Sequence, residues 1–262
     1  MASGTRFETS PRSMRAAECC SSVCSDRTPM GAGAPRNSRS LVAAVLDLVA
    51  PPKCGLCYEV QAPPICDECR AKIAPACGGG CQRCGVGAAV GCPYCREIGY
   101  LNALRSVARY EGAGGIAVRR LKFSRFTPLS LPMSEMMRAL YDECFSDVDA
   151  VVPVPMHWLR LSVRGFNQSL LLCRALPQEV VQPALLRRVR FTRQQARLRG
   201  RERQRSVRGA FEAPRSVEGM RVLLVDDVMT TGATLRECAD TLRSAGASWV
   251  GALTFARELP RG

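Results

Sequence analysis

The stretch that decides the fold is Val222-Leu-Leu-Val-Asp-Asp-Val-Met-Thr-Thr-Gly-Ala-Thr-Leu235. Its apolar run Val222–Val225 predicts a short buried strand that leads into Asp226 and Asp227. A loop of threonine and glycine follows and opens a helix, which we expect over Thr231–Ala245. In open α/β sheets, ligands bind in the crevice at the carboxyl ends of the strands. The sequence therefore predicts a ligand site formed by the two acids and the helix N-terminus.

The chemistry of this loop favours a ligand that carries both hydroxyl groups and phosphate. A helix N-terminus has unpaired amides and about half a unit of positive charge, so it suits a phosphate. Thr230, Thr231 and Thr234 add hydroxyl donors, and Gly232 lets the backbone close around the anion. The two carboxylates can accept hydrogen bonds from sugar hydroxyls, but they would repel a bare anion.

Two simpler interpretations apply to the acid pair taken alone. One is a strand-end acid pair before an ordinary threonine N-cap. The other is a metal-binding acid of the response-regulator or nucleotidase type. The Thr-Thr-Gly-Ala-Thr continuation, in its strand–loop–helix context, favours a phosphoribosyl ligand instead.

Strand and helix patterns alternate through the rest of the chain after the cysteine-rich segment. We expect strands over Leu101–Tyr110, Val148–Val154 and Ser248–Phe255. We expect helices over Gly114–Phe123, Met133–Phe145 and Asn167–Leu176. This order predicts an α/β fold with a parallel core sheet and helices on its faces.

The composition allows one sizeable α/β domain and a small module within 262 residues. The net charge of +14 comes almost wholly from arginine, since only Lys53, Lys72 and Lys122 are lysines. High genomic GC content would also enrich arginine, so composition alone says little about a partner. We expect residues 1–40, rich in Ser, Arg, Gly and Pro, to be disordered.

The hydropathy pattern predicts no membrane span. The longest strongly apolar run, Leu41–Ala50, is interrupted by Asp47 and is too short to cross a bilayer. The residues before it do not follow a signal-peptide plan. We therefore expect a cytoplasmic location, where thiols stay reduced and paired cysteines favour metal ligands over disulfides.

Eight of the 15 cysteines form four CxxC knuckles: Cys54/Cys57, Cys66/Cys69, Cys81/Cys84 and Cys92/Cys95. Two knuckles complete a tetrahedral Cys₄ site, so the pattern predicts two zinc ions. The spacing favours sequential pairing, and a cross-braced pairing stays open. Because the apolar residues between the knuckles are too few for a core, we expect structural zinc that folds this segment. A redox role of the CxxC pairs is a minor alternative.

The stretch Val222–Leu235 resembles the phosphoribosyl diphosphate (PRPP) binding signature of type I phosphoribosyltransferases. The resemblance implies that Asp226 and Asp227 hold the ribose hydroxyls. It also implies a 5′-phosphate site made by Thr230, Thr231, Gly232, Ala233 and Thr234. Mg²⁺ would accompany the PRPP.

Further segments resemble the ComF branch of this superfamily: Val151–Ser169, Leu121-Lys-Phe123, and the run from Arg193-Gln-Gln195 to Val207-Arg-Gly-Ala-Phe211. The cysteine segment also fits, and the resemblance covers roughly Leu46–Arg257. We expect a double zinc-ribbon module over residues 41–98 and a phosphoribosyltransferase-like domain over residues 99–262.

The superfamily also implies a place for the diphosphate, in the loop after Val154. Arg164 and Asn167 are the expected contacts there. His157 is the only histidine, and we expect it to pack beside Trp158 rather than to act as a general acid.

The segment Arg187–Arg208 holds ten arginines against one acid, Glu202, which is a local charge of +9. Three interpretations stay open: a solvated surface, a mobile hood that closes over PRPP, and a groove for the nucleic-acid backbone. The nucleic-acid candidates are Arg199, Arg201, Arg203 and Arg205. Since only Phe191 could stack on a base, the contact would be electrostatic and tolerant of sequence.

The ComF resemblance implies a factor that handles incoming single-stranded DNA in natural transformation, with PRPP as ligand or regulator. A helicase or other DNA-uptake proteins would be its partners. Two alternatives stay open: an active phosphoribosyltransferase of nucleotide metabolism, and a catalytically silent PRPP sensor. The sequence identifies no segment that would select an acceptor.

Overall fold

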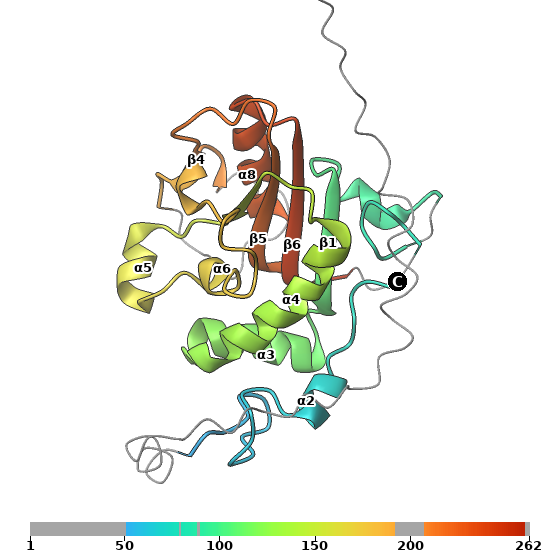
Figure 1. The fold of residues 1–262 in the computed structure, drawn as a ribbon, viewed down its shortest axis with the longest axis vertical. Coiled ribbons are helices and arrows are strands. Elements are labelled where there is room, and N and C mark those ends of the chain that lie inside the picture. The colour runs from blue at the N-terminus through green and yellow to red at the C-terminus, as the bar shows by residue number, and fades with distance from the viewer. Residues whose placement is uncertain (1–50, 79, 88–89, 192–206, 260–262) are drawn as a thin grey trace, which may run out of the picture.

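A four-stranded parallel sheet lies at the centre of the molecule, with the strand order β1-β6-β5-β2 (Figure 1). The computed structural model describes residues 51–78, 80–87, 90–191 and 207–259. The strands are β1 (Ala103–Arg109), β2 (Ala150–Pro153), β5 (Arg221–Met229) and β6 (Trp249–Arg257). Their pairings are all parallel, so the predicted α/β fold is confirmed. A small antiparallel ribbon pairs β3 (Arg187–Arg188) with β4 (Phe211–Glu212).

Helices cover both faces of the sheet. The helices of the described residues are α2 (Asp67–Ala71), α3 (Gly112–Phe123), α4 (Ser130–Cys144), α5 (Trp158–Arg164), α6 (Gln168–Leu171) and α8 (Ala233–Ser244). Short 3₁₀ turns lie at Pro93–Arg96, Thr127–Leu129 and Pro183–Leu185. α3 and α4 pack on one face of the sheet and α8 packs on the other. None of these helices is long and apolar enough to cross a membrane.

Alternate residues of the central strand β5 enter two different cores. Leu223 and Val225 pack with α3 and α4, whereas Val222 and Leu224 pack with α8. Burial on both faces explains why this strand is a continuous apolar run in the sequence rather than an alternation. The two cores together fix the strand just before Asp226.

The acid pair lies within β5 rather than after it, which corrects the predicted end of the strand at Val225. Parallel pairing with β6 continues through Asp226 and Val228, which lie opposite Thr254 and Ala256. The following helix begins at Ala233, not at Thr231. Its N-cap is Gly232, which adopts a left-handed conformation with φ 69°.

The helix expected over Asn167–Leu176 is wrong in extent, because α6 ends at Leu171. The turns after it are held by the side chain of Gln178, whose Nε2 donates to the carbonyl oxygens of Cys173 and Leu176 at 2.8 and 2.7 Å. The segment before α6, which we expected to be a loop, contains α5. β2 is also shorter than predicted, and α4 begins three residues earlier than Met133.

The two halves of the cysteine segment pack into opposite cores. Cys54 and Ile65 join the core of α3 and α4, whereas Cys84 and Leu101 join the core of α8. The first half accordingly lies next to α3 and the second beside β1 (Figure 1). The expected boundary between residues 98 and 99 stays a prediction. The segment expected to be disordered, residues 1–40, lies outside the described residues, as does the apolar run Leu41–Ala50.

Candidate functional site

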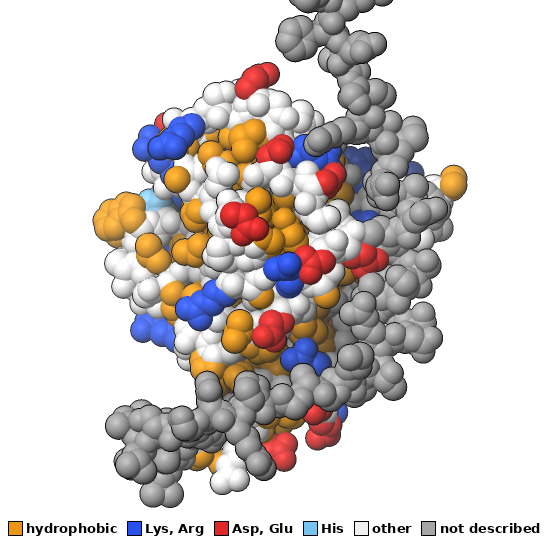
Figure 2. Space-filling model, viewed as in Figure 1, with side chains coloured by type: hydrophobic (Ala, Val, Ile, Leu, Met, Phe, Trp, Pro, Cys, Tyr) orange, Lys and Arg blue, Asp and Glu red, His pale blue; other side chains and the backbone are white. Residues whose placement is uncertain are grey.

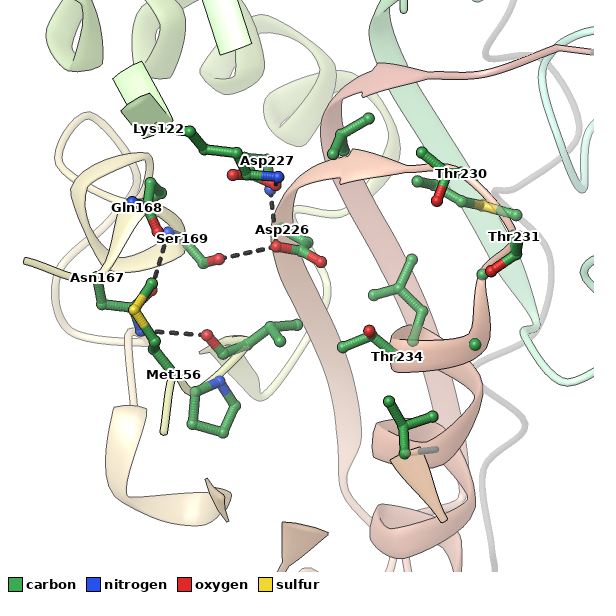
Figure 3. A pocket seen from close by; sticks show the side chains of 18 of the residues that line it. Lys122, Met156, Asn167, Gln168, Ser169, Asp226, Asp227, Thr230, Thr231 and Thr234 are labelled. Carbon is green, nitrogen blue, oxygen red and sulfur yellow. Dashed lines mark hydrogen bonds and ion pairs between the residues drawn. The ribbon is translucent and has the colours of Figure 1, made fainter. Parts of the chain in front are cut away.

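A cavity of about 420 Å³ opens at the carboxyl ends of β2 and β5. Its walls come from α3, from the segment between β2 and α6, and from the loop between β5 and α8 (Figure 3). The cavity brings together every residue predicted to contact the ligand: Asp226, Asp227, Thr230, Thr231, Gly232, Ala233, Thr234, Arg164 and Asn167. It occupies the crevice in which parallel α/β sheets bind their ligands.

Asp226 and Asp227 are held by helices on two sides of the cavity. The hydroxyl of Ser169 in α6 donates to Oδ1 of Asp226 at 2.9 Å, and the amide of Asp227 donates to the same oxygen at 2.9 Å (Figure 3). The Asp227 side chain is 5% exposed, and its Oδ1 lies 2.8 Å from Nζ of Lys122 in α3. The two carboxylates are therefore positioned before any ligand binds.

The electrostatics of this group differ from residue to residue. Burial and the neighbouring charge of Asp227 raise the pKa of Asp226 to about 7. Burial alone would lower the pKa of Lys122, but attraction to Asp227 and Asp226 more than offsets it and raises this pKa. Lys122 is therefore charged at neutral pH, whereas Asp226 is only partly ionised there. A ligand that donates hydroxyl hydrogen bonds would favour the ionised form of Asp226.

The segment Thr230–Thr234, which consists of the β5–α8 loop and the first two residues of α8, has the form of an anion cradle. Gly232 has φ 69°, a conformation that favours glycine, and no side chain caps the helix that follows. The first amides of α8 have no partner within the helix, and they carry the partial positive charge of its N-terminus. Threonines 230, 231 and 234 lie around this end (Figure 3). The loop can therefore receive a phosphate.

Three arginines add positive charge to the cavity wall: Arg160 and Arg164 from α5, and Arg188 from β3. Burial lowers the pKa of each guanidinium. Cations that are partly removed from water in one cavity would gain from an anionic ligand with several oxygens.

Asn167 lines the cavity, but its side chain binds the protein backbone. Its Nδ2 donates to the carbonyl oxygen of Val154 at 3.1 Å, and its Oδ1 accepts from the amide of Ser169 at 3.1 Å. These bonds fix the turn between β2 and α6 and set Ser169 beside Asp226. Direct contact of Asn167 or Arg164 with a ligand stays a prediction.

Seven polar residues of the cavity were not among the predicted site residues: Tyr110, Lys122, Arg160, Gln168, Ser169, Arg188 and Glu258. Lys122 had a signal, since it is one of three lysines and lies in the Leu121-Lys-Phe123 motif. Gln168 is 2% exposed, and its Nε2 has no hydrogen-bond partner among the described residues. A buried amide of this kind at a cavity wall is suited to a polar ligand.

His157 is a packed residue at the start of α5. It is buried, and its Nδ1 accepts from the amide of Leu159 at 3.2 Å. Its ring centroid lies 5.6 Å from that of Trp158 and 5.1 Å from that of Phe191. α5 itself presents apolar side chains outward, with Trp158 66% and Val163 73% exposed (Figure 2).

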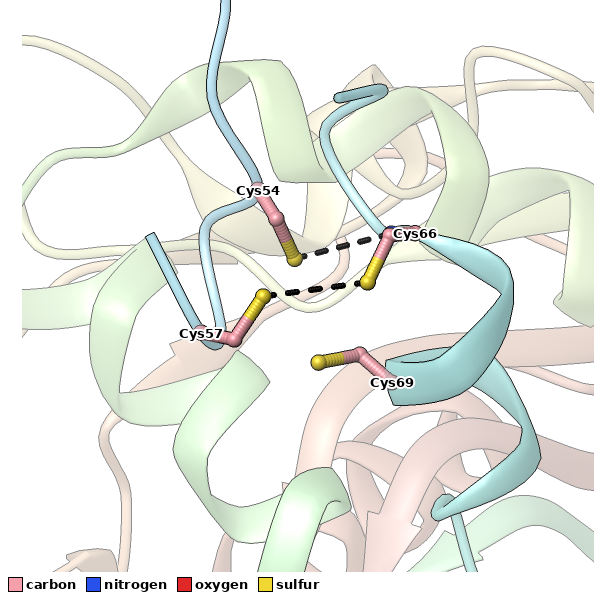
Figure 4. Close-up of side chains that lie close together, drawn as sticks. All are labelled: Cys54, Cys57, Cys66 and Cys69. Atoms are coloured by element: carbon pink, nitrogen blue, oxygen red, sulfur yellow. Dashed lines mark hydrogen bonds between the residues drawn. The ribbon is translucent and has the colours of Figure 1, made fainter. Parts of the chain in front are cut away.

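Each group of cysteines brings four sulfur atoms together, as Figure 4 shows for Cys54, Cys57, Cys66 and Cys69. The first cysteine group is Cys54, Cys57, Cys66 and Cys69, and the second is Cys81, Cys84, Cys92 and Cys95. Within each group all Sγ atoms lie within 4.8 Å of one another, and the thiols are free. A tetrahedral zinc with Zn–S bonds of about 2.3 Å would place its sulfurs about 3.8 Å apart. Both groups could hold a metal ion, and the pairing is sequential.

Backbone amides favour one thiolate in each cysteine group. Burial opposes ionisation of Cys54 and Cys81, but nearby backbone amides lower the pKa of each to about 6. Burial and the neighbouring thiols instead raise the pKa of Cys69 and Cys95. A divalent cation at the centre would allow all four sulfurs to ionise, so the donor set fits a metal.

The nucleic-acid candidates Arg199, Arg201, Arg203 and Arg205 lie outside the described residues. The residues that flank them do reach the cavity, since Arg188 and Val207 line it. The arginine-rich segment is therefore attached to the chain at the cavity on both sides.

Comparison with known proteins agrees with this geometry. The family of the phosphoribosyl transferase domain matches residues 179–260. DNA utilization protein YhgH of Salmonella typhimurium is 33% identical over 191 residues, which cover 68% of this chain and 84% of that protein. Competence protein ComFC of Bacillus subtilis is 29% identical over 206 residues, which cover 74% and 84% of the two chains. Competence protein F of Haemophilus influenzae is 38% identical over 104 residues, which cover 37% and 45%.

Proposed function

This chain belongs to the ComF family. From that premise we propose that it binds PRPP with Mg²⁺ in the cavity at the carboxyl ends of β2 and β5. It is a phosphoribosyl transferase-like protein related to those of competence and DNA utilization. The proposal assigns a ligand to its cavity and a nucleic-acid role to its arginine-rich segment.

One observation carries the proposal: a single cavity joins an acid pair, an uncapped helix N-terminus and three arginines. Asp226 and Asp227 would accept from the ribose diol, and the β5–α8 loop would hold the 5′-phosphate. Arg160, Arg164 and Arg188 would receive the diphosphate. A bare phosphate would offer the acids no hydroxyl group, and a nucleoside would offer the helix N-terminus no phosphate. The cavity volume is within the usual range for small-molecule sites, roughly 300–1,000 Å³.

The chain's own residues fit Mg²⁺ as part of the ligand, because carboxylate and diphosphate oxygens are the donors that this ion prefers. When bound, Mg²⁺ would offset charge on the departing diphosphate. Lys122 orients Asp227, and the Ser169 hydroxyl orients Asp226. In turnover, the bond between C1 and the diphosphate would break as an acceptor nitrogen bonds to C1, and the arginines would stabilise the leaving anion.

Zinc is the metal that we propose for both cysteine groups. All-sulfur sets of four suit Zn²⁺, and a complete set leaves no open position for catalysis. The ions would hold the two halves of the cysteine segment against the two cores.

Handling of single-stranded DNA is the role that we propose for the arginine-rich segment. The charge of +9 over Arg187–Arg208 and the names of the competence relatives support this role. Because the segment starts and ends at the cavity, DNA and PRPP would compete for some of the same arginines. A helicase or other DNA-uptake proteins would be the partners.

The experiment that tests the proposal measures diphosphate release from Mg²⁺-PRPP, with and without single-stranded DNA and nucleobases. Release with a base would identify an enzyme, and release stimulated by DNA alone would link turnover to DNA. PRPP binding without release under any condition would identify a sensor. Absence of PRPP binding by the wild-type protein would refute the assignment of the cavity.

A further inference from the structure

Tyr100 joins the end of the cysteine segment to the β5–α8 loop. Its side chain is buried, and its hydroxyl donates to the carbonyl oxygen of Gly232 at 3.0 Å, across 132 positions of the chain. Gly232 is the N-cap of α8. The contact therefore fixes the peptide from which the helix starts.

The surroundings of Tyr100 leave the β5–α8 loop little freedom at Gly232. A Cβ at this position would overlap the Tyr100 hydroxyl. The guanidinium of Arg236 lies 4.2 Å from the centroid of the tyrosine ring, and Arg243 donates from Nη1 to the tyrosine carbonyl oxygen. Burial raises the pKa of the Tyr100 phenol, so the hydroxyl keeps its proton and continues to donate.

The second cysteine group sets the position of Tyr100. Arg83 lies inside the first knuckle of that group, and its Nη2 donates to the carbonyl oxygens of Gly99 and Leu101 at 2.9 and 2.7 Å. Its Nε donates to Leu101 at 3.0 Å as well. These two carbonyls flank Tyr100 in the chain. A shift of the knuckle would move Tyr100 and, through its hydroxyl, the β5–α8 loop.

The first cysteine group lies on the other face of the sheet. Its buried residues, Cys54, Cys66 and Cys69, belong to the core of α3 and α4, whereas Tyr100 belongs to the core of α8. The two groups therefore differ in their connection to the cavity. The second has a direct route of hydrogen bonds to it through Arg83 and Tyr100.

We propose that Tyr100 is a positioning residue for the β5–α8 loop, and that it couples metal binding at the second cysteine group to PRPP binding in the cavity. The inference rests on the proposed function, since it takes PRPP as the ligand. Coupling between two sites is reciprocal, so PRPP must also strengthen the hold on that metal. Bound metal holds the knuckle, the knuckle holds Tyr100, and Tyr100 holds the loop in its ligand-binding form.

The first test compares Tyr100→Phe with Tyr141→Phe, a buried tyrosine in the other core. Calorimetry with Mg²⁺-PRPP should show affinity about three- to tenfold weaker for Tyr100→Phe, which loses one hydrogen bond. The Tyr141→Phe control should stay within about twofold of wild type. Hydrogen exchange of the amides of the β5–α8 loop should accelerate in Tyr100→Phe alone, while its zinc content stays that of the wild type. Unchanged affinity and exchange in Tyr100→Phe would overturn the inference.

The second test needs no variant. Release of metal from the wild-type protein into a chelator is followed with and without Mg²⁺-PRPP, and inorganic phosphate serves as the control. PRPP should slow the release of one of the two ions, and this protection should weaken in Tyr100→Phe and in Arg83→Gln, which keeps all eight cysteines. Equal release with and without PRPP, in a protein that does bind PRPP, would refute the coupling alone. Failure of the wild-type protein to bind PRPP would refute both the inference and the proposed function.

Discussion

Nζ of Lys122 lies 2.8 Å from Oδ1 of Asp227, and this ion pair connects α3 to the acid pair on β5. Lys122 offsets one of two adjacent carboxylate charges at the edge of a cavity that also holds arginines and a helix N-terminus. An anionic ligand therefore meets less repulsion from the acids than the bare Asp-Asp sequence implies. Removal of one member of such a pair leaves the other charge partly buried, which is costly.

Binding of Mg²⁺-PRPP should strengthen as the pH rises from 6 to 8. The pKa of Asp226 is raised to about 7, so below that pH the carboxyl keeps a proton and accepts less well from a ribose hydroxyl. The stability of the free protein should depend on pH in the opposite direction. The native state binds the Asp226 proton more tightly than the unfolded state, so this residue's contribution to stability falls as the pH rises from about 4 to 7.

Calorimetry at pH 6, 7 and 8 measures the dependence of affinity on pH. Asp226→Asn is the control, because it separates this carboxyl from the ionisation of the phosphates. If the pH dependence were the same in wild type and Asp226→Asn, the assignment of the titrating group would be wrong.

Gly232→Ala should lower both stability and PRPP affinity more than the matched substitution Gly219→Ala. Both glycines have left-handed φ angles, 69° and 71°, so each substitution costs roughly 1–2 kcal/mol in backbone strain. A Cβ added at Gly232 also overlaps the Tyr100 hydroxyl, whereas a Cβ at Gly219 meets no atom within 4 Å. Thermal unfolding measures the loss of stability, and calorimetry measures the loss of PRPP affinity. Equal losses of both quantities in the two variants would contradict the prediction.

Purified protein should contain about two zinc ions per chain, one for each cysteine group. Elemental analysis of wild type, Cys57→Ser and Cys95→Ser should give about two, one and one, because three sulfurs hold zinc far less well than four. Because each group packs into a core of the domain, strong chelation should also lower the melting temperature. A folded, soluble preparation without metal would show that the cysteine groups do not bind zinc as structural sites.

The arginine-rich segment should give single-stranded DNA binding a steep dependence on salt. Each phosphate neutralised on a single strand contributes about −0.7 to the slope of log affinity against log salt, so five or six contacts give roughly −4. Replacement of Arg199, Arg201, Arg203 and Arg205 by Gln should flatten the slope by roughly two to three units and weaken all sequences alike.

The same quadruple variant separates the interpretations of this segment. Loss of PRPP affinity with DNA affinity intact would identify a hood over the cavity. Loss of both, with competition between the two ligands, would show one segment that serves two anions. Loss of neither would show a solvated surface.

The sequence predicted what depends on local pattern. The alternation of strand and helix patterns predicted the parallel sheet, and the apolar run before Asp226 predicted a buried strand that leads to the acid pair. The CxxC spacings favoured the sequential cysteine groups but left a cross-braced pairing open. The resemblance to the ComF family could also be recognised from the sequence, because its motifs are short and contiguous. The relatives confirm it.

Features that depend on distant pairing were missed. The extension of β5 past the acids requires its pairing with β6. The contact of Lys122 with Asp227 joins separate elements, as does that of Tyr100 with Gly232. Propensity and periodicity describe neighbours along the chain, so they do not register such contacts.

The measurement that tests the account most directly is a calorimetric titration of Mg²⁺-PRPP into wild type, Asp227→Asn and the control Asp240→Asn, which makes the same change at an exposed position of α8. We predict that wild type and Asp240→Asn bind PRPP equally, and far better than inorganic phosphate. Asp227→Asn should keep its fold by circular dichroism but lose at least about tenfold in affinity, because it loses a charged acceptor for the ribose. Equal PRPP affinity in all three proteins, or affinity for PRPP no better than for phosphate, would contradict the assignment of the cavity.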